Sequence, residues 1–588
     1  MPATQANREV SIKTALGTDV LLFSSMDGAE QLGRLSEYRV QLLSASSDLK
    51  IADVLGKTMT VSLDVSDEGV RHFNGVVTRF SCTGWRGDFA TYEAILHPWL
   101  WLLTRASNCR IFQDMTVVDI VKSVCDDGMY GGMVTLMVNS LSGSYAQLPY
   151  CVQYRETDFD FVCRLLEEAG IYFFFTHAMD KHTMVLADSY SAHSPIAGYG
   201  NLKFSMGQSL DTRVEESVAS WTAAGEIQSS SYVLNDFDFE KASSSSNGGL
   251  LSTARIPAAF GQSAYEMFDY PGKYTTATEG NALARARIER LHGQCERIDA
   301  STNARGLYPG GLFTLVEHPR DDQNRSYLIT SAHYRIRGTD YRSGSGNARL
   351  AVECTFTAIG DDHAYRPLPT IAKPIVQGPQ TAIVVGKAGE EIWTDKFGRV
   401  KVQFHWDRQG KDDEKSSCWV RVSQSWAGKG WGAMFIPRVG MEVIVSFLEG
   451  DPDRPLITGC VYNSDALPPY ALPAAQTQSG VMSNSSKGGG GFNEWRFEDK
   501  KGEEEVFMHA EKDFSRVVKN NDTLQVTGDQ KITVNKTIVI EATTSIEFKV
   551  GGSSIKIEPA KITVKSVAIE IAADANIKIE AGAIVEIN

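Results

Sequence analysis

Five acidic residues stand close together in one stretch of the sequence and could in principle do chemistry. The stretch reads CVQYRETDFDFVCRLLEEAGIYFFF, residues 151–175. Paired carboxylates at short spacing can serve as general acid and base. The residues concerned are Glu156, Asp158, Asp160, Glu167 and Glu168. The surrounding pattern favours a structural role, because it is typical of a capped amphipathic helix.

That helix is predicted over residues 158–169. Thr157 is expected to be its N-cap, with Asp160 as partner at the third helical position, and Gly170 should end it before a strand that begins with IYFFF. The apolar positions with helical spacing are Phe159, Val162, Cys163 and Leu166. In this interpretation Asp158 only keeps the first turn polar, so Asp158→Asn should leave the function of the protein nearly intact.

Other catalytic and ligand-binding patterns are missing from the sequence. It contains no GxSxG, GxxxxGK[ST], HExxH or CxxC motif, and its nine cysteines are scattered. His405 and His509 are lone histidines, and GKGWG at 428–432 lacks the last glycine of a dinucleotide loop. We therefore expect no enzyme activity, no cofactor and no metal site.

Aromatic residues between 378 and 463 could stack on nucleic-acid bases. They are Trp393, Phe404, Trp406, Trp419, Trp426 and Trp431. This segment, however, has eleven Lys/Arg against eleven Asp/Glu, and the whole chain carries a net charge of −14. Because binding to a phosphate backbone requires an excess of positive charge, nucleic acid is not an expected partner, and packing and assembly are the favoured use of these rings.

Length and periodicity predict a mainly β chain with minor α structure and several domains. At about 150 residues per domain, 588 residues suggest three or four. We expect a β-rich region with short helices at 1–377, a small closed barrel of the OB type at 378–463, a linker at 464–513 and a repeat region at 514–588. The Ser/Gly run at 242–249 should be an exposed loop. The start, MPATQANREVSIK, has no signal-peptide pattern, so synthesis in the cytoplasm is expected.

The last region repeats pairs of apolar residues separated by one polar residue. The first members of nine pairs follow one another at intervals of 8, 6, 8, 9, 7, 7, 8 and 8. Alternation at period two places the apolar residues on one face of a strand, as in Ile555 and Ile557 around Lys556. The predicted core members are Leu524, Val526, Ile532, Val534, Ile538, Ile540, Ile546, Phe548, Ile555, Ile557, Ile562, Val564, Ile569, Ile571, Ile577 and Ile579.

The apolar face of this repeat needs a cover that the chain itself does not supply. No helix or second sheet remains in the sequence to pack on it, so the cover must be a neighbouring coil or another chain. A single-chain β-solenoid is one possibility, but left-handed β-helices usually keep a six-residue step. Three identical chains wound together are favoured. The final strand, with Ile584, Val585, Ile587 and Asn588, would then be left open for a small β-rich cap.

Several long motifs in order resemble the VgrG family, the spike proteins of the bacterial type VI secretion system. They include YRETDFDFVCRLLEEAGIYFFF, GPQTAIVVGKAGEEIWTDKFGRVKVQFHWDR, SSCWVRVSQSWAGKGWGAMFIPRVGMEVIVSFLEGDPDRPLITGCVYN and FNEWRFEDKKGEEEVFMHAEKDF. The resemblance implies a homotrimer similar to the hub and spike of contractile phage tails, fused in one chain. It further implies a hub seated on the hexameric Hcp tube, an intertwined β-helical needle, a PAAR-type cap, and effectors or their adaptors as cargo.

The same resemblance implies a mechanical role, in which the tip is secreted through the type VI apparatus and punctures a target membrane. Some family members continue into an enzymatic domain, whereas this chain is expected to stop within the needle, so that any toxic activity belongs to a separate partner. The alternative is a phage tail hub or tailspike that hydrolyses cell wall or polysaccharide. Such an enzyme needs two carboxylates across a sugar cleft, and no lysozyme-sized segment separates the barrel from the needle.

Overall fold

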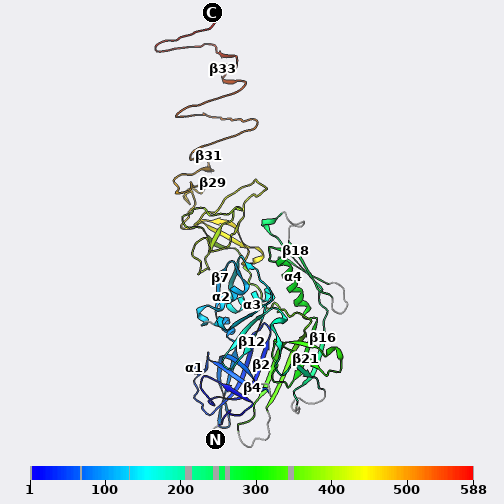
Figure 1. Ribbon diagram of the computed structural model, residues 1–588. Coiled ribbons are helices and arrows are strands. Elements are labelled where there is room, and N and C mark those ends of the chain that lie inside the picture. The colour runs from blue at the N-terminus through cyan, green and yellow to red at the C-terminus, as the bar shows by residue number, and fades with distance from the viewer. Residues whose placement is uncertain are drawn as a thin grey trace.

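The protein is elongated, with a broad N-terminal end and a narrow C-terminal end (Figure 1). The computed structural model describes residues 3–65, 69–131, 133–205, 215–242, 250–257, 265–341 and 350–586. Residues 243–249, most of the predicted Ser/Gly loop, lie outside the described part. Strands predominate over helices throughout, so the prediction of a mainly β chain is confirmed.

A thirteen-stranded sheet forms the hub, in the order β1-β4-β5-β6-β3-β2-β22-β23-β20-β16, with β14, β15 and β21 beside that path. The antiparallel pairing of β2 with β22 joins segments about 300 positions apart in sequence, so the two halves of the hub share one core. The bounds are β1 Val10–Lys13, β2 Leu22–Gln31, β3 Glu37–Ser44, β4 Thr58–Val65, β5 Gly69–Arg86, β6 Phe89–His97, β14 Ser194–Pro195, β15 Asn201–Lys203, β16 Val218–Gly225, β20 Glu296–Thr302, β21 Gly311–Val316, β22 Ser326–Arg337 and β23 Ala351–Gly360.

A second core lies between the hub sheet and the barrel, and two helices pack in it. Its helix α3 spans Asp158–Ala169, and Val162, Cys163 and Leu166 are buried there as the periodicity predicts. The second helix of this core is α2, Val117–Cys125. Helix α1, Ile51–Val54, lies apart from it, beside β5. The strands of this part of the chain are β7 Ser107–Phe112, β8 Met115–Thr116, β9 Met137–Ser140, β10 Gln147–Leu148, β11 Cys151–Thr157, β12 Tyr172–His177 and β13 His182–Ala187.

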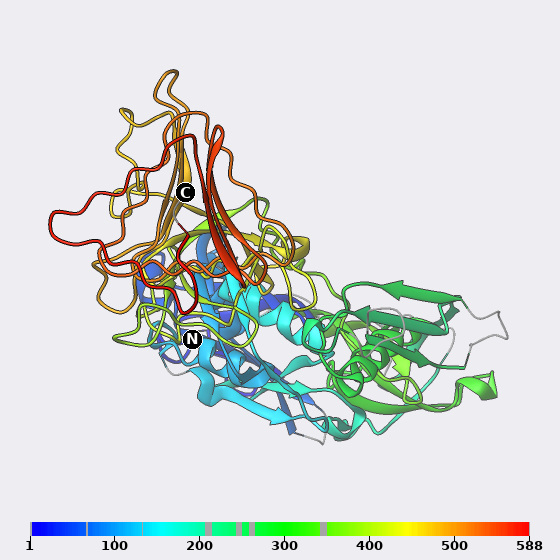
Figure 2. The ribbon, with the colours of Figure 1, turned by 90° about the horizontal axis from the view of Figure 1, so that it is seen from above.

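A smaller module extends to one side of the long axis, as the view from above shows (Figure 2). Helix α4, Ala277–His292, packs on a three-stranded sheet of β17 Ser231–Asp236, β18 Leu250–Arg255 and β19 Glu266–Asp269. A capping box at Thr276 and Glu279 starts this helix.

The barrel consists of five short strands in the order β25-β24-β27-β28-β26. A bridge between Val400 and Val420 connects the two edge strands, which closes the sheet on itself. This is the small OB-type barrel that the sequence predicts. The bounds are β24 Gln380–Val385, β25 Lys401–Phe404, β26 Arg421–Val422, β27 Glu442–Phe447 and β28 Pro455–Val461.

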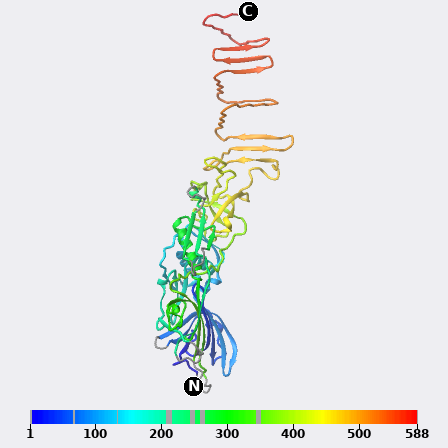
Figure 3. The same ribbon diagram turned by 90° about the vertical axis from the view of Figure 1, so that its right-hand side faces the viewer.

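Beyond the barrel, two small antiparallel sheets are separated by a long extended segment, and their strands cross the long axis (Figure 3). The first sheet lies within 464–513, a segment that was expected to be a linker. It forms there because the alternation in EWRFE and EVFMH is long enough for paired strands. The bounds are β29 Gln478–Met482, β30 Glu494–Glu498, β31 Glu505–His509, β32 Ile546–Val550, β33 Ser553–Glu558 and β34 Lys561–Lys565.

Candidate assembly interface

The apolar pairs of the repeat fall in two rows on one face of the β32–β34 sheet. Its register aligns one row of three residues and a second row beside it. The first row is Ile546, Ile557 and Ile562. The second row is Phe548, Ile555 and Val564. On the other face Lys556 stands between Glu547 and Thr563, so each strand has one apolar and one polar side.

Among the residues that the structure describes, none covers this apolar face in a single chain. Ile562 is 68% exposed, Val564 50% and Ile555 45%. Of the sixteen predicted core residues, Ile546 is half-buried and the other fifteen are exposed. At the tip Ile584 is 73% and Val585 50% exposed, whereas Ile587 and Asn588 lie outside the described residues. Apolar surface on this scale is typical of an interface with another chain.

The backbone between β31 and β32 also lacks partners. Within the described part of the chain, residues 512–545 contain no strand and make no backbone-to-backbone hydrogen bond. Buried N–H and C=O groups are almost always paired, so burial of this segment in an assembly would require hydrogen bonds from another chain. Leu524, Val526, Ile532, Val534, Ile538 and Ile540 all lie in this segment.

The accessible surface of the whole chain leads to the same conclusion. The chain exposes 34,772 Å². A compact monomer of 64.5 kDa would expose about 20,000 Å². The excess comes from a long, thin C-terminal part that has no core of its own.

The acidic cluster of residues 156–168 is structural. Thr157 accepts a hydrogen bond from the Asp160 N–H at 3.0 Å, and Gly170 ends α3 in the left-handed conformation, as predicted. The interpretation that Asp158 only keeps the first turn polar was wrong, because this residue is 1% exposed and accepts from Arg110 Nη2 at 2.8 Å. Tyr130 Oη donates to its other oxygen at 2.7 Å. Asp158 is therefore a buried carboxylate paired with an arginine and a tyrosine inside the hub.

Two other acids of the cluster are also paired with cations. Arg164 pairs with Glu156 at 2.7 Å, and Arg34 pairs with Glu167 at 2.8 Å. Phe159, expected in the buried face, is only half-buried. Phe161 and Leu165 are buried instead, because the helix is covered on nearly all sides.

A buried ionic joint, which the sequence analysis missed, connects hub and barrel. Lys373 Nζ lies 2.7 Å from Asp451 Oδ1 and 2.5 Å from Asp453 Oδ2, while Asp453 accepts from the Val152 N–H at 2.6 Å. Burial opposes the charge of Lys373, but the two carboxylates hold its pKa above the usual value. Burial alone would raise the pKa of Asp451, and the ammonium groups of Lys373 and Lys273 lower it to about 2.

Among the described residues, one group of three side chains has the composition of a metal site. Glu296, Asp362 and His363 bring their ligand atoms within 4.8 Å of one another. Arg325 forms ion pairs with both carboxylates, 3.1 Å from Asp362, so a guanidinium already neutralises the cluster. We describe it as an ion-pair network of the hub.

All six barrel aromatics form ring contacts with one another, in three pairs. Trp393 stacks on Trp419, and Phe404 on Trp406 at 5.0 Å. Trp426 and Trp431 contact each other edge to face at 4.9 Å and remain 64% and 58% exposed.

None of the helices in the described ranges is both long and apolar enough to span a membrane.

Family profiles built from known proteins match the hub, the barrel and the C-terminal part of this chain. The profile of the phage tail baseplate hub (GPD) family covers residues 29–340, and that of the type VI secretion system/phage-baseplate injector OB domain covers 381–462. The bacteriophage T4 gp5 C-terminal trimerisation domain matches 479–587. The type VI secretion system spike protein VgrG1a of Pseudomonas aeruginosa is 42% identical, over 99% of this chain and 95% of that protein. The chain belongs to the VgrG family of type VI secretion system spike proteins.

Other VgrG proteins and solved structures agree with this assignment. VgrG1b of P. aeruginosa is 47% identical over 91% of this chain and 71% of its own length. The E. coli c3393 protein, a type VI component similar to T4 gp27 and gp5, is 22% identical with a TM-score of 0.54, and covers 77% of this chain and 100% of its own. The VgrG fold also matches the half-lidded Francisella PdpA–VgrG complex at a TM-score of 0.54 and 10% identity, over 86% of this chain and 88% of that one. The alternative of a hydrolytic phage hub is not favoured.

Proposed function

We propose that three copies of this VgrG chain wind together into the needle of a type VI spike. The segment 512–545 carries this proposal, because its backbone groups and its apolar side chains are unpartnered in one chain. Two further copies would supply both the strand hydrogen bonds and the cover for the apolar face. The T4 gp5 trimerisation profile over 479–587 supports this geometry.

The proposed needle core consists of the sixteen residues from Leu524 to Ile579 named above. Burying each such side chain contributes about 1.5–3 kcal/mol before the loss of chain entropy is subtracted. A closed, intertwined sheet also leaves no free strand edge, which makes it stiff and resistant to aggregation. We propose the division into hub 1–377, OB barrel 378–463, neck 464–513 and needle 514–588.

The role that follows is mechanical and non-enzymatic. The hub would sit on the hexameric Hcp tube, and the needle would puncture a target membrane after export through the type VI apparatus. Ile584, Val585, Ile587 and Asn588 would bind a PAAR-type cap through strand addition and apolar contact. Effectors or their adaptors would travel as cargo on the trimer.

Sedimentation equilibrium of the purified full-length chain tests the proposal directly. We expect a single species of three times the 64.5 kDa chain mass. Limited proteolysis should leave the needle intact in that species. A stable monomer with an equally protected segment 512–545 would show that the chain covers this face by itself and would refute the three-chain needle.

A further inference from the structure

The second and third strands of the barrel, β25 and β26, carry three cations and an aromatic ring on their outer side. The closing bridge of the barrel places Arg399 opposite Arg421, and Lys401 opposite Trp419. The two bridging valines are 0% exposed, so these four neighbours point away from the barrel core. We call these four residues the barrel face. In barrels of the OB type, this side of the second and third strands binds ligands, together with the loops after the first and fourth strands.

A segment of the module that contains α4 already lies on the barrel face. Its sequence is DFDFEK, residues 236–241, and we call it the strap. The centre of the Phe239 ring lies 4.6 Å from the guanidinium carbon of Arg421 and 5.1 Å from that of Arg399. Glu240 Oε1 lies 3.0 Å from Arg399 Nη1. An acidic, aromatic piece of the chain therefore occupies the position where a barrel of this type holds its ligand.

The two loops that flank the barrel face also contact the strap. Phe397, in the loop between β24 and β25, meets the Phe239 ring edge to face at 5.4 Å. Arg454, in the loop between β27 and β28, donates a hydrogen bond to the buried Asp236 at 3.0 Å. Figure 1 shows the upper end of the module beside the barrel. The strap thus contacts both loops and the face between them.

The barrel face needs a negative partner. Arg399 and Arg421 stand opposite each other on neighbouring strands, and like charges in that arrangement repel each other. Asp395 pairs with Arg399 at 2.7 Å, and the carboxylate of Glu240 adds a second negative charge beside the two cations. The Phe239 ring offers its electron-rich face to both guanidinium groups. The chemistry that fits the barrel face is therefore a carboxylate next to an aromatic ring.

The part of the strap that lies on the barrel face is held shallowly. The side chain of Glu240 is 43% exposed, and Phe239 is half-buried. Segments with few buried contacts open at a much smaller cost in free energy than the whole fold. A segment of another protein with the same chemistry can therefore compete with the strap.

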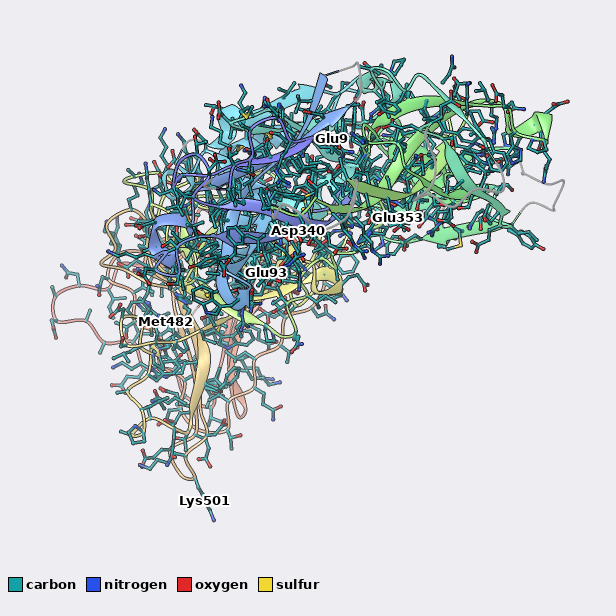
Figure 4. All side chains as sticks on the ribbon, turned by 90° about the horizontal axis from the view of Figure 1, so that it is seen from below. Glu9, Glu93, Asp340, Glu353, Met482 and Lys501 are labelled. Atoms are coloured by element: carbon teal, nitrogen blue, oxygen red, sulfur yellow. The ribbon has the colours of Figure 1, made fainter. Side chains whose placement is uncertain are left out.

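We propose that the barrel face is a docking site for an acidic, aromatic peptide segment of a cargo protein, and that the strap fills this site until such a segment displaces it. This inference rests on the proposed cargo role of the spike and names the surface that holds the cargo. Seen from below, the module and Lys501, in the turn after β30, project from the hub in different directions (Figure 4). Cargo bound in place of the strap is held beside the barrel and leaves the tip free for a cap.

A fluorescent peptide with the sequence of the strap, NDFDFEKA, tests the site by anisotropy with the full-length protein. Phe239→Ala removes the ring between the two arginines, and Phe237→Ala removes a strap ring that is 40% exposed. Because an occupied site lowers the apparent affinity for a competitor, opening the strap should raise it. We expect the peptide to bind Phe239→Ala at least tenfold more tightly than the parent, and Phe237→Ala like the parent. Equal affinity for Phe239→Ala and the parent would overturn the docking site.

Glu240→Gln guards against a folding defect in Phe239→Ala, because its side chain is largely in solvent. This variant removes the ion pair with Arg399 and keeps the ring. We expect its affinity for the peptide to lie between those of the parent and Phe239→Ala. An affinity equal to that of the parent would contradict an exchangeable strap.

A second change in the Phe239→Ala background locates the bound peptide. Arg421→Gln removes a cation of the barrel face, and Lys387→Gln makes the same change of charge at an exposed lysine elsewhere on the barrel. We expect Arg421→Gln to abolish binding and Lys387→Gln to preserve it. Binding that survives Arg421→Gln would place the peptide outside the barrel face. A short single-stranded oligothymidylate that binds Phe239→Ala when the peptide does not would show a nucleic-acid site and refute the proposal.

Sedimentation of the same samples separates the docking site from the proposed trimer, because the strap and the barrel face belong to one chain. Tight peptide binding by a monomeric Phe239→Ala and a monomeric parent would refute the three-chain needle and support the docking site. A trimeric parent and a trimeric Phe239→Ala with equal affinities would do the reverse.

Discussion

At the scale of single residues, Asp158 shows how burial changes the expected effect of a substitution. Its carboxylate neutralises Arg110 and also accepts from Tyr130 and Gln153. Asp158→Asn leaves the guanidinium buried without this counter-charge, so we expect a loss of roughly 3 kcal/mol in the unfolding free energy of the hub. Calorimetric unfolding measures this change in free energy. Asp160→Asn, in the same turn, keeps an acceptor for Thr157 and should cost less than about 1 kcal/mol. Equal losses in the two variants would contradict the buried pair.

Ile562 and Lys561 form a matched pair for the needle. Ile562 belongs to the apolar row of β34, and Lys561 precedes it on the other face. Ile562→Asp would bring up to three carboxylates to one axis, where desolvation and repulsion oppose assembly. We expect Ile562→Asp to abolish the trimer or to open the needle to protease, and Lys561→Asp to do neither. A protease-resistant trimer of Ile562→Asp would place this residue outside the core.

At the scale of elements, the ionic joint decides how firmly hub and barrel hold together. Lys373→Met removes the ammonium that lies between Asp451 and Asp453 and leaves two close, buried carboxylates. We expect the barrel to lose its fixed position on the hub, seen as faster amide hydrogen exchange at Val152 and in β28. Lys387→Met, at an exposed lysine of the barrel, is the control. Unchanged exchange in Lys373→Met would mean that apolar packing alone holds the joint.

The joint should also weaken in acid. The pKa of Asp451 is lowered in the folded protein from 3.8 to about 2. A depressed pKa contributes stability above the unfolded value, and this contribution is lost as pH falls from about 4 toward 2. Asp453 acts in the opposite direction, because burial raises its pKa and favours its protonated form. We expect exchange at the joint to rise below pH 4 in the parent and to rise less in Lys373→Met. An equal rise in both would exclude Asp451 as the titrating group.

At the scale of the whole molecule, the tip is separable from the rest of the spike. Deleting residues 583–588 removes Ile584 and Val585 and leaves all sixteen proposed core residues in place. We expect this variant to remain a trimer and to lose binding of a PAAR-type protein in co-purification. Undiminished binding would place the cap site elsewhere on the needle.

The sequence by itself determined the features that depend on local pattern. The cap, the length and the end of α3 follow from Thr157, Asp160 and Gly170, because capping involves only backbone groups within a few residues. Period-two alternation likewise predicted which residues of β32–β34 lie on the apolar face, and regularly spaced short strands indicated the barrel.

Only the tertiary structure decided which residues from distant segments meet. Arg110 reaches Asp158 across 48 positions, and Lys373 reaches Asp453 across 80. No local pattern predicts such pairs, because a charge is stabilised by whatever the fold places beside it. The β29–β31 sheet was expected to be a linker for a related reason: its alternating strands are short, and only the register of the three strands places their apolar side chains on one face.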